Sequence, residues 1–262
     1  MIRAANTGAV TTIELDRYFR SVLPIEEFET ADSSMNGLQV DNNGEGIHKI
    51  VFAVDACLES FKRCAAAGGA MLFVHHGLFW GAPLALKGVH RGRIQFLLDN
   101  NIALYAVHLP LDQHPRLGNN AALAELLGME ESEPFGLYHG KKIGYKGKLK
   151  KPLTIDEAVK AINYMDRLPL GVYPFGKRIN ESCAVISGGA SHEALQALEE
   201  EVDLYITGEI GHSMYHPAME GKLNIVAGGH YSTEVWGVRS LMAECASAFN
   251  IDVEFIDIPT GL

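Results

Sequence analysis

The chain has 262 residues, with 22 lysines and arginines against 32 aspartates and glutamates, giving a formal net charge of −10. Its 47% hydrophobic and 21% charged residues are typical of a globular protein and exclude disorder as the main state. The acidic balance argues against a protein that coats nucleic acid, because such binding depends on lysine and arginine neutralising phosphates. The first sixteen residues lack the apolar core of a secretion signal, and no apolar run approaches the length of a membrane span. We therefore expect a soluble, cytoplasmic protein with no membrane association and no nucleic-acid partner.

Strand and helix patterns alternate along the first half of the chain. Thr11 and Glu14 form a capping box, which predicts a helix that ends before Pro24. The pattern continues as strand, helix, strand, helix, strand and helix, at residues 48–54, 57–67, 70–74, 94–98, 102–107 and 119–127. Gly128 then supplies the C-terminal stop of the last of these helices. Such alternation predicts an α/β fold.

The second half of the chain repeats this order. We expect strands at 183–186, 203–207 and 223–227 and helices at 192–200 and 234–249. Alignment by element places 70–77 beside 203–210, and 107–112 beside 229–234. In the second pair, each segment carries a histidine and, four residues later, an acid directly after an apolar strand. We interpret the two halves as related α/β lobes facing each other, approximately 1–130 and 131–262. The alternative is coincidence between two generic strand-helix patterns.

A lysine-rich segment lies between the halves. Six lysines fall within residues 141–151. One interpretation is a solvated hairpin face with Ile143, Tyr145 and Leu149 turned inward. The other is an electropositive rim that attracts an anionic substrate. We favour the hairpin face, and a second capping box, formed by Thr154 and Glu157, predicts that a helix follows it.

Histidine is the unusual residue of the composition, with eleven copies. His75 and His76 directly follow a predicted buried strand, and the carboxyl ends of strands are where ligand sites gather in α/β folds. Neighbouring residues of an extended chain point to opposite sides, so one ion would not reach both rings, whereas two ions could take one each. An ordinary polar strand end is the alternative for this pair alone.

Two further histidines follow apolar strands and are each paired with an acid. His108 precedes Asp112, and we expect Pro110 to keep the chain between them out of a helix. His230 precedes Glu234, which we expect to begin the next helix. Imidazole and carboxylate without thiolate suit Zn, Fe or Mn, and a bridging carboxylate could hold two ions roughly 3.5–4 Å apart. The cysteines show no C-x-x-C spacing, so we expect no thiolate-bound zinc.

Five motifs in fixed order resemble the signature of the NIF3-like proteins, also called GTP cyclohydrolase 1 type 2 homologues. The motifs are NGLQV (36–40), HHG (75–77), H-x-x-L-D (108–112), TGE (207–209) and GHYSTE (229–234). The resemblance covers nearly the whole chain, as a single NIF3-like unit over residues 8–258. It implies an α/β fold of two related lobes with mixed sheets and the metal site between them.

The resemblance also implies what the site contains. Its dinuclear site would hold two divalent ions per chain, with Zn, Fe, Mn and Ni all compatible with the donors. Glu234 would bridge the two ions, and the chain would assemble into a ring-shaped homohexamer, a trimer of dimers, with its sites facing an inner cavity. By match to the motifs, the ligands would be His75, His76, Asp112, His230 and Glu234.

The sequence departs from the family pattern in two places near the site, in the third motif and after TGE, where it continues with Ile210, Gly211 and His212 instead of paired basic or histidine residues. Many members have threonine after the histidine of the third motif, whereas this chain has Leu109. The family pattern therefore does not tell which residues form hydrogen bonds to the ligands in this chain. We consider His108, His114 and His212 as residues that support the ligands or the substrate. Glu209 stands where the repeat alignment places His76, and it is our candidate general acid or base.

Two functions are compatible with this pattern. The first is a metal-dependent hydrolase in which two ions activate a water and a C–N or ester bond is opened; the resemblance suggests GTP or a related nucleotide as the small-molecule ligand. The second is a metal-binding or regulatory adaptor without catalysis. Turnover that depends on metal and on Glu234 would distinguish them.

Overall fold

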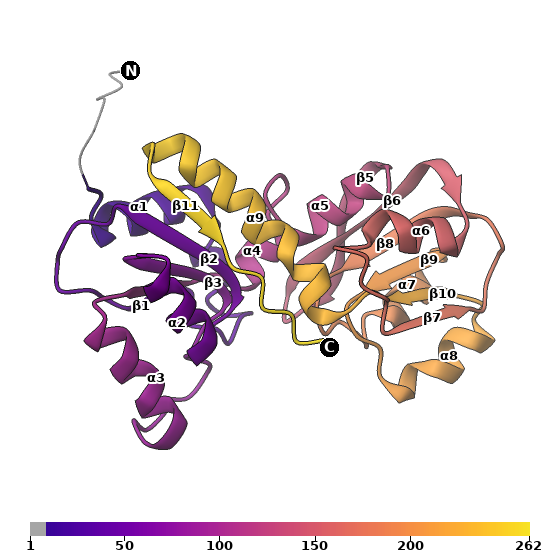
Figure 1. The fold of residues 1–262 in the computed structure, drawn as a ribbon. Coiled ribbons are helices and arrows are strands. Elements are labelled where there is room, and N and C mark those ends of the chain that lie inside the picture. The colour runs from indigo at the N-terminus through magenta and orange to yellow at the C-terminus, as the bar shows by residue number, and fades with distance from the viewer. Residues whose placement is uncertain (1–8) are drawn as a thin grey trace. The chain divides into compact units, whose positions relative to one another are not determined.

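A computed structural model of the chain describes residues 9–262 (Figure 1). Residues 1–8, which include the first residue of the expected 8–258 unit and half of the stretch tested for a secretion signal, lie outside this description. The chain divides into two compact units: an N-terminal unit that extends to Leu111 and includes Val238–Ile258, and a second unit of Asp112–Gly237 and Pro259–Leu262. The expected lobes were 1–130 and 131–262, whereas here the first unit ends at Leu111 and takes in residues 238–258 as well. Within residues 9–262, no helix combines the length and apolar character needed to cross a membrane.

The N-terminal unit contains a mostly parallel sheet in the order β1-β4-β3-β2-β11. Strand β1 pairs antiparallel with β4 at the edge, and the other pairs are parallel. The strands are β1 Gly37–Val40, β2 Lys49–Asp55, β3 Met71–His76, β4 Ala103–Ala106 and β11 Asp252–Phe255. The helices are α1 Thr12–Val22, η1 Glu26–Phe28, α2 Leu58–Ala66 and α3 Gly88–Asp99.

Alternation along these strands divides the apolar side chains between two faces of the sheet. Leu72 and Leu104 share a core cluster with Phe61 of α2, while the next residues along each strand face the other way. There Phe19 of α1 packs against Phe73 and Tyr105, with ring centroids 5.1 and 4.8 Å away. Burial on both faces explains the continuous apolar runs of the sequence.

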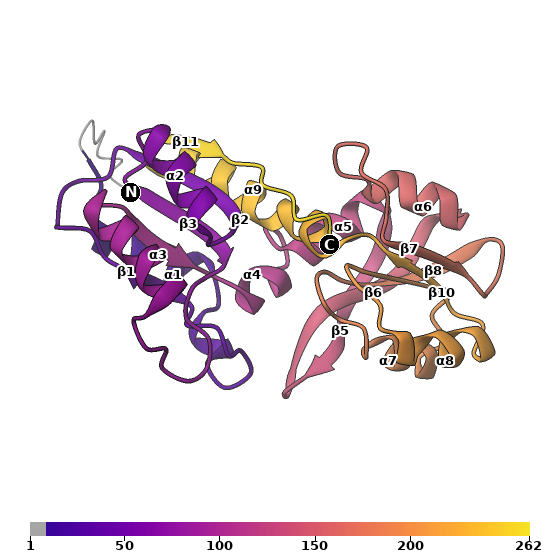
Figure 2. The same ribbon diagram turned by 60° about the horizontal axis from the view of Figure 1, so that its bottom comes forward.

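The second unit contains a mixed sheet in the order β5-β6-β8-β9-β10-β7. Its strands are β5 Met129–Tyr138, β6 Lys141–Leu153, β7 Gly171–Pro174, β8 Asn180–Ile186, β9 Leu204–Thr207 and β10 Asn224–Ala227. Its helices are α5 Asn119–Leu126, α6 Ile155–Ile162, α7 Ala194–Glu199, η2 His212–Met214 and α8 Tyr215–Glu220. Figure 2 shows α6 on one face of this sheet and α7 and α8 on the other. Two helices cross the boundary between the units, α4 Leu109–Gln113 and α9 His230–Phe249.

Both sheets contain the same arrangement of four strands. Strands β2, β3 and β4 are parallel and end on antiparallel β1; strands β8, β9 and β10 are parallel and end on antiparallel β7. The sequence alignment of 70–77 with 203–210 pairs β3 with β9, the central strand of each set. The expected α/β fold with two mixed sheets is therefore confirmed.

Local signals in the sequence are confirmed where they depend on adjacent residues. Thr11 with Glu14, and Thr154 with Glu157, form complete capping boxes at the starts of α1 and α6. Gly128 ends α5 with a φ of +66°. The hairpin β5–β6 also has its expected inner face, which consists of buried Ile143, Tyr145 and Leu149.

Three expectations near the motifs are wrong. His75 and His76 are the last two residues of β3 rather than the residues after it. Pro110 lies inside α4, in its first turn, where a missing N–H costs nothing and the fixed φ suits a helix. Glu234 does not begin a helix, because α9 starts four residues earlier at His230.

Candidate metal centre

A cluster of three imidazoles lies in the N-terminal unit at the carboxyl ends of β3 and β4. The ring centroid of His75 is 4.7 Å from that of His76 and 5.1 Å from that of His108. One ring nitrogen from each of the three lies within 4.8 Å of the others. The expectation that neighbouring His75 and His76 must point apart is therefore wrong, since their rings approach each other where the strand ends. Three imidazoles at this spacing are a donor set for Zn²⁺ or another first-row divalent ion.

Each imidazole of this cluster is oriented by an oxygen atom at Nδ1. His75 Nδ1 donates to the carbonyl of Val107 at 3.0 Å. His76 Nδ1 lies 2.8 Å from Asp55 Oδ1, and His108 Nδ1 lies 2.9 Å from Asp32 Oδ1. Donation from Nδ1 places the lone pair of a neutral imidazole on Nε2, which is the arrangement a metal ligand requires.

Asp32 is the central acceptor of this network. Its carboxylate accepts hydrogen bonds from Asn36 Nδ2 and from the backbone N–H groups of Ser34 and Leu109, besides that from His108. Burial opposes ionisation of Asp32, but these hydrogen bonds and the charge of His108 outweigh it and lower its pKa. The carboxylate therefore stays charged while it fixes the His108 ring.

The NGLQV motif supports the backbone that carries the histidines. Asn36 Oδ1 accepts from the backbone N–H of His108 at 2.7 Å, and Gln39 Oε1 accepts from that of Leu78 at 2.7 Å. A Cβ atom on Gly77 would lie 2.3 Å from Gln39 Nε2, so a larger residue there would displace the Gln39 amide from its hydrogen bond to the Leu78 backbone. Strand β1 lies at the edge of the sheet.

A second cluster, of acids with one histidine, lies in the second unit. The carboxyl groups of Asp112 and Glu234 each offer an oxygen within 4.8 Å of the other. His230 Nε2 lies 3.3 Å from Glu234 Oε1, because residues four apart share one face of α9. The side chains of Asp112 and Glu234 are almost completely buried. Two buried carboxylates this close are costly without a compensating positive charge, so the cluster fits a cation.

Hydrogen bonds fix the geometry of this acidic cluster. Asp112 Oδ1 accepts from Asn119 Nδ2 at 2.9 Å and from Ser187 Oγ at 2.8 Å. A Cβ on Gly188, which has a φ of +65°, would lie 2.2 Å from Glu234 Oε1. Glycine is therefore needed there both for its backbone conformation and for the space it leaves around the carboxylate.

Glu209 completes the cluster by orienting His230. Its Oε1 lies 2.5 Å from His230 Nδ1. Burial would lower the pKa of His230, but hydrogen bonds and charge from Glu234 and Glu209 outweigh it and raise the pKa to about 9. The contact with Nδ1 assigns Glu209 the same place beside His230 that Asp55 has beside His76.

Residues 10–261 match the family described as Duf34/NIF3 (NGG1p interacting factor 3). The chain belongs to this family. It is 40% identical to the GTP cyclohydrolase 1 type 2 homolog of Treponema pallidum (strain Nichols), over 97% of this chain and 100% of that protein. A solved structure described as protein ybgI of unknown function matches with a TM-score of 0.88, 34% identity and coverage of 97% of this chain and 100% of that one. A crystal structure of a Thermus thermophilus protein matches with a TM-score of 0.85, 34% identity and the same coverage.

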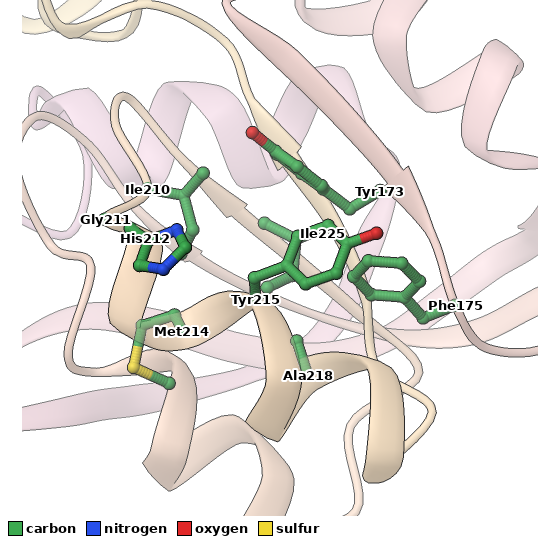
Figure 3. A pocket seen from close by; sticks show the side chains of 9 residues that line it. All are labelled: Tyr173, Phe175, Ile210, Gly211, His212, Met214, Tyr215, Ala218 and Ile225. Carbon is green, nitrogen blue, oxygen red and sulfur yellow. The ribbon is translucent and has the colours of Figure 1, made fainter.

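Other candidate residues of this NIF3-family chain have different surroundings. His108 Nδ1 contacts Asp32. His114 Nδ1 accepts from the backbone N–H groups of Arg116 and Leu117 and so shapes its own loop. His212 lies in η2 and lines a separate pocket (Figure 3).

Sequence reasoning missed the residues that hold the ligands in place. Asp32, Asp55 and Ser187 lie outside the motifs or at their borders, and nothing in their local sequence distinguishes them. Asn36 is the exception, because it belongs to the NGLQV motif.

Proposed function

We propose that this NIF3-family chain binds two divalent ions and is a metal-dependent hydrolase. The proposed ligands are His75, His76, Asp112, His230 and Glu234. The observation that carries the proposal is the buried acidic cluster. Two carboxylates, of Asp112 and Glu234, lie close together there beside the imidazole of His230, and a carboxylate in such a group can bridge two ions. Glu234 is the proposed bridge, since its carboxyl adjoins both Asp112 and His230.

The donors fit zinc, iron, manganese or nickel and contain no thiolate. When bound, a pair of such ions would lower the pKa of a coordinated water and polarise the bond to be opened. The chain's own residues orient the imidazoles through Nδ1 and hold Asp112 through two hydrogen bonds. Glu209 is the proposed general acid or base, because its exposed carboxylate bonds a proposed ligand directly.

Several relatives are named GTP cyclohydrolase 1 type 2 homologs. We therefore propose a nucleotide such as GTP, or a related compound with a hydrolysable C–N or ester bond, as the substrate. The candidate metal ligands support the reaction class, and the names of the relatives support the substrate class.

Elemental analysis of protein purified without chelator tests the ligands. We expect two divalent ions per chain in the wild type and a sharp loss in the double variant His76→Ala with Glu234→Ala. The control is His48→Ala, which removes an exposed histidine outside both clusters and should leave the metal content unchanged. Unchanged content in the double variant would refute the ligand assignment.

Turnover assays test the reaction. Metal-loaded protein offered GTP, phosphoesters and cyclic amidines should hydrolyse at least one of them, and both chelation and Glu234→Gln should abolish the activity. Glu220→Gln, an exposed glutamate of α8, is the matched control and should remain active. Full metal content without turnover would favour the alternative, a metal-binding or regulatory adaptor.

A further inference from the structure

An aromatic pocket lies in the second unit, on the face of the sheet that carries α8 (Figure 3). Three rings form its walls, those of Tyr173, Phe175 and Tyr215. The Tyr215 ring stands almost perpendicular to the other two, at 84° to Tyr173 and 82° to Phe175, with centroids 6.3 and 5.1 Å away. The pocket is completed by Ile210, Gly211, His212, Met214, Ala218 and Ile225.

The backbone fixes these rings in place. Tyr173 lies on β7 and Phe175 directly follows this strand, and the Phe175 backbone N–H donates to the Tyr173 carbonyl at 3.1 Å in a tight turn at Pro174. The two rings lie 6.0 Å apart between centroids. The segment is held by the bond from the Gly176 backbone N–H to Asn224 Oδ1, at 2.8 Å. A Cβ on Gly176 would lie 2.3 Å from the Lys222 carbonyl, so this close approach requires glycine. The pocket is therefore built into the fold at the ends of β7 and α8.

The size and charge of the pocket restrict its ligand. Its volume is about 130 Å³, close to the roughly 150 Å³ of an apolar cavity that binds benzene. Among its nine lining residues there is no lysine, arginine, aspartate or glutamate. A charged group would lose hydration here and find no acidic, lysine or arginine side chain, whereas a planar ring gains edge and face contacts with three aromatic walls.

We propose that this pocket binds an uncharged planar ring of a small-molecule ligand. The ring contacts Tyr173, Phe175 and Tyr215, and its substituents leave through the solvent side, where Tyr215 is 42% exposed. The pocket wall begins at Ile210, the residue directly after Glu209, which contacts His230. We assign the ring to the substrate on the strength of the proposed function alone, whereas binding of a ring by this pocket does not depend on it.

Binding of phenol and of cyclohexanol tests the pocket, because the two probes differ in ring planarity and not in ring size or charge. Titrations are followed by NMR of labelled methyl groups in Ile210, Met214 and Ile225. We expect these signals to shift with phenol, and phenol to bind about tenfold more tightly than cyclohexanol. Equal affinities, or no shift of these signals, would overturn the proposal.

Variants test which ring is responsible. Tyr215→Ala should weaken phenol binding about tenfold, and Phe175→Leu, which keeps an apolar side chain, should weaken it less. The control is Tyr138→Ala, which removes an exposed tyrosine of β5 stacked on His139. If the Tyr215 and Tyr138 variants bind phenol alike, the pocket does not bind the ring.

Metal analysis separates this proposal from the proposed function. Tyr215→Ala should retain the wild-type metal content, and KM for any hydrolysed substrate should rise while the metal content stays constant. Phenol binding by protein in which elemental analysis finds no metal would support the pocket and count against the proposed function. Metal binding without phenol binding would support the proposed metal site and overturn the pocket.

Discussion

At the scale of single residues, the four histidines of the two candidate ligand clusters share one arrangement. Oxygen atoms hold the Nδ1 atoms of His75, His76, His108 and His230, at distances between 2.5 and 3.0 Å. Three of these oxygens belong to carboxylates, which strengthen the basicity of the ring as well as orienting it. The arrangement predicts that the supporting carboxylates affect metal binding although they are not ligands.

Asp55→Ala should test this prediction at His76. Loss of the 2.8 Å hydrogen bond releases the ring from its fixed orientation and should weaken metal affinity about 10- to 100-fold. The affinity is measured by competition with a chelating dye. Asp252→Ala, an exposed carboxylate on β11, is the control. Equal affinities in the two variants would show that Asp55 does not support the ligand.

At the scale of elements, one carboxylate fastens the start of β8 to its neighbours. Asp203 Oδ2 accepts from the backbone N–H groups of Glu181 and Ser182, and Lys177 Nζ lies 2.8 Å from Oδ1. Burial would raise the pKa of Asp203, but the hydrogen bonds from Lys177 and the backbone outweigh it and lower the pKa. The charged carboxylate therefore stabilises this part of the second unit.

This shift predicts a pH dependence of stability. A depressed folded pKa gives stabilisation that is complete above the unfolded pKa, about 4, and is lost as pH falls through the folded pKa. Asp203→Asn should lower the free energy of unfolding in urea by about 1 kcal/mol at pH 7. The difference from the wild type should shrink below pH 4.

Glu181→Gln provides the control for this measurement. This variant removes a neighbouring exposed charge but keeps the backbone N–H of residue 181, which donates a hydrogen bond to Asp203. Its unfolding free energy should stay close to that of the wild type at both pH values. A constant gap between wild type and Asp203→Asn from pH 7 to pH 3 would mean that ionisation of Asp203 contributes nothing.

At the scale of the whole molecule, lysines of the segment 141–151 form ion pairs with glutamates of neighbouring elements. Lys146 pairs with Glu133 and Glu200, Lys148 with Glu131, and Lys150 with Glu130. These pairs connect β6 with its neighbours and favour the solvated hairpin face over an electropositive rim. The absence of a nucleic-acid partner stays a prediction, which rests on the net charge of −10.

The oligomeric state is a second prediction at this scale. The resemblance to the family implies a ring-shaped homohexamer built from dimers, so light scattering should give six times the chain mass of 28.6 kDa. The measurement should be repeated after chelation, because metal bound only by the folded state would stabilise the subunits. A monomer at micromolar concentration with full metal content would refute the hexamer.

The sequence by itself determined the α/β class, the capped helices, the repeated strand order and the family. These features depend on residues close together in the chain or on motifs in fixed order, so they are readable without coordinates. The predictions for Pro110 and for the start of α9 were wrong because they also used only neighbouring residues, and neighbouring residues do not determine how a short segment packs.

Only the tertiary structure decided which residues surround the metal ligands. Asp32 is 76 residues from His108, and Ser187 is 75 residues from Asp112, so no local pattern relates them. The aromatic pocket likewise joins rings from β7, the segment after it and α8. Hydrogen bonds and ring contacts act over a few ångströms in space, and the fold alone sets which distant residues come that close.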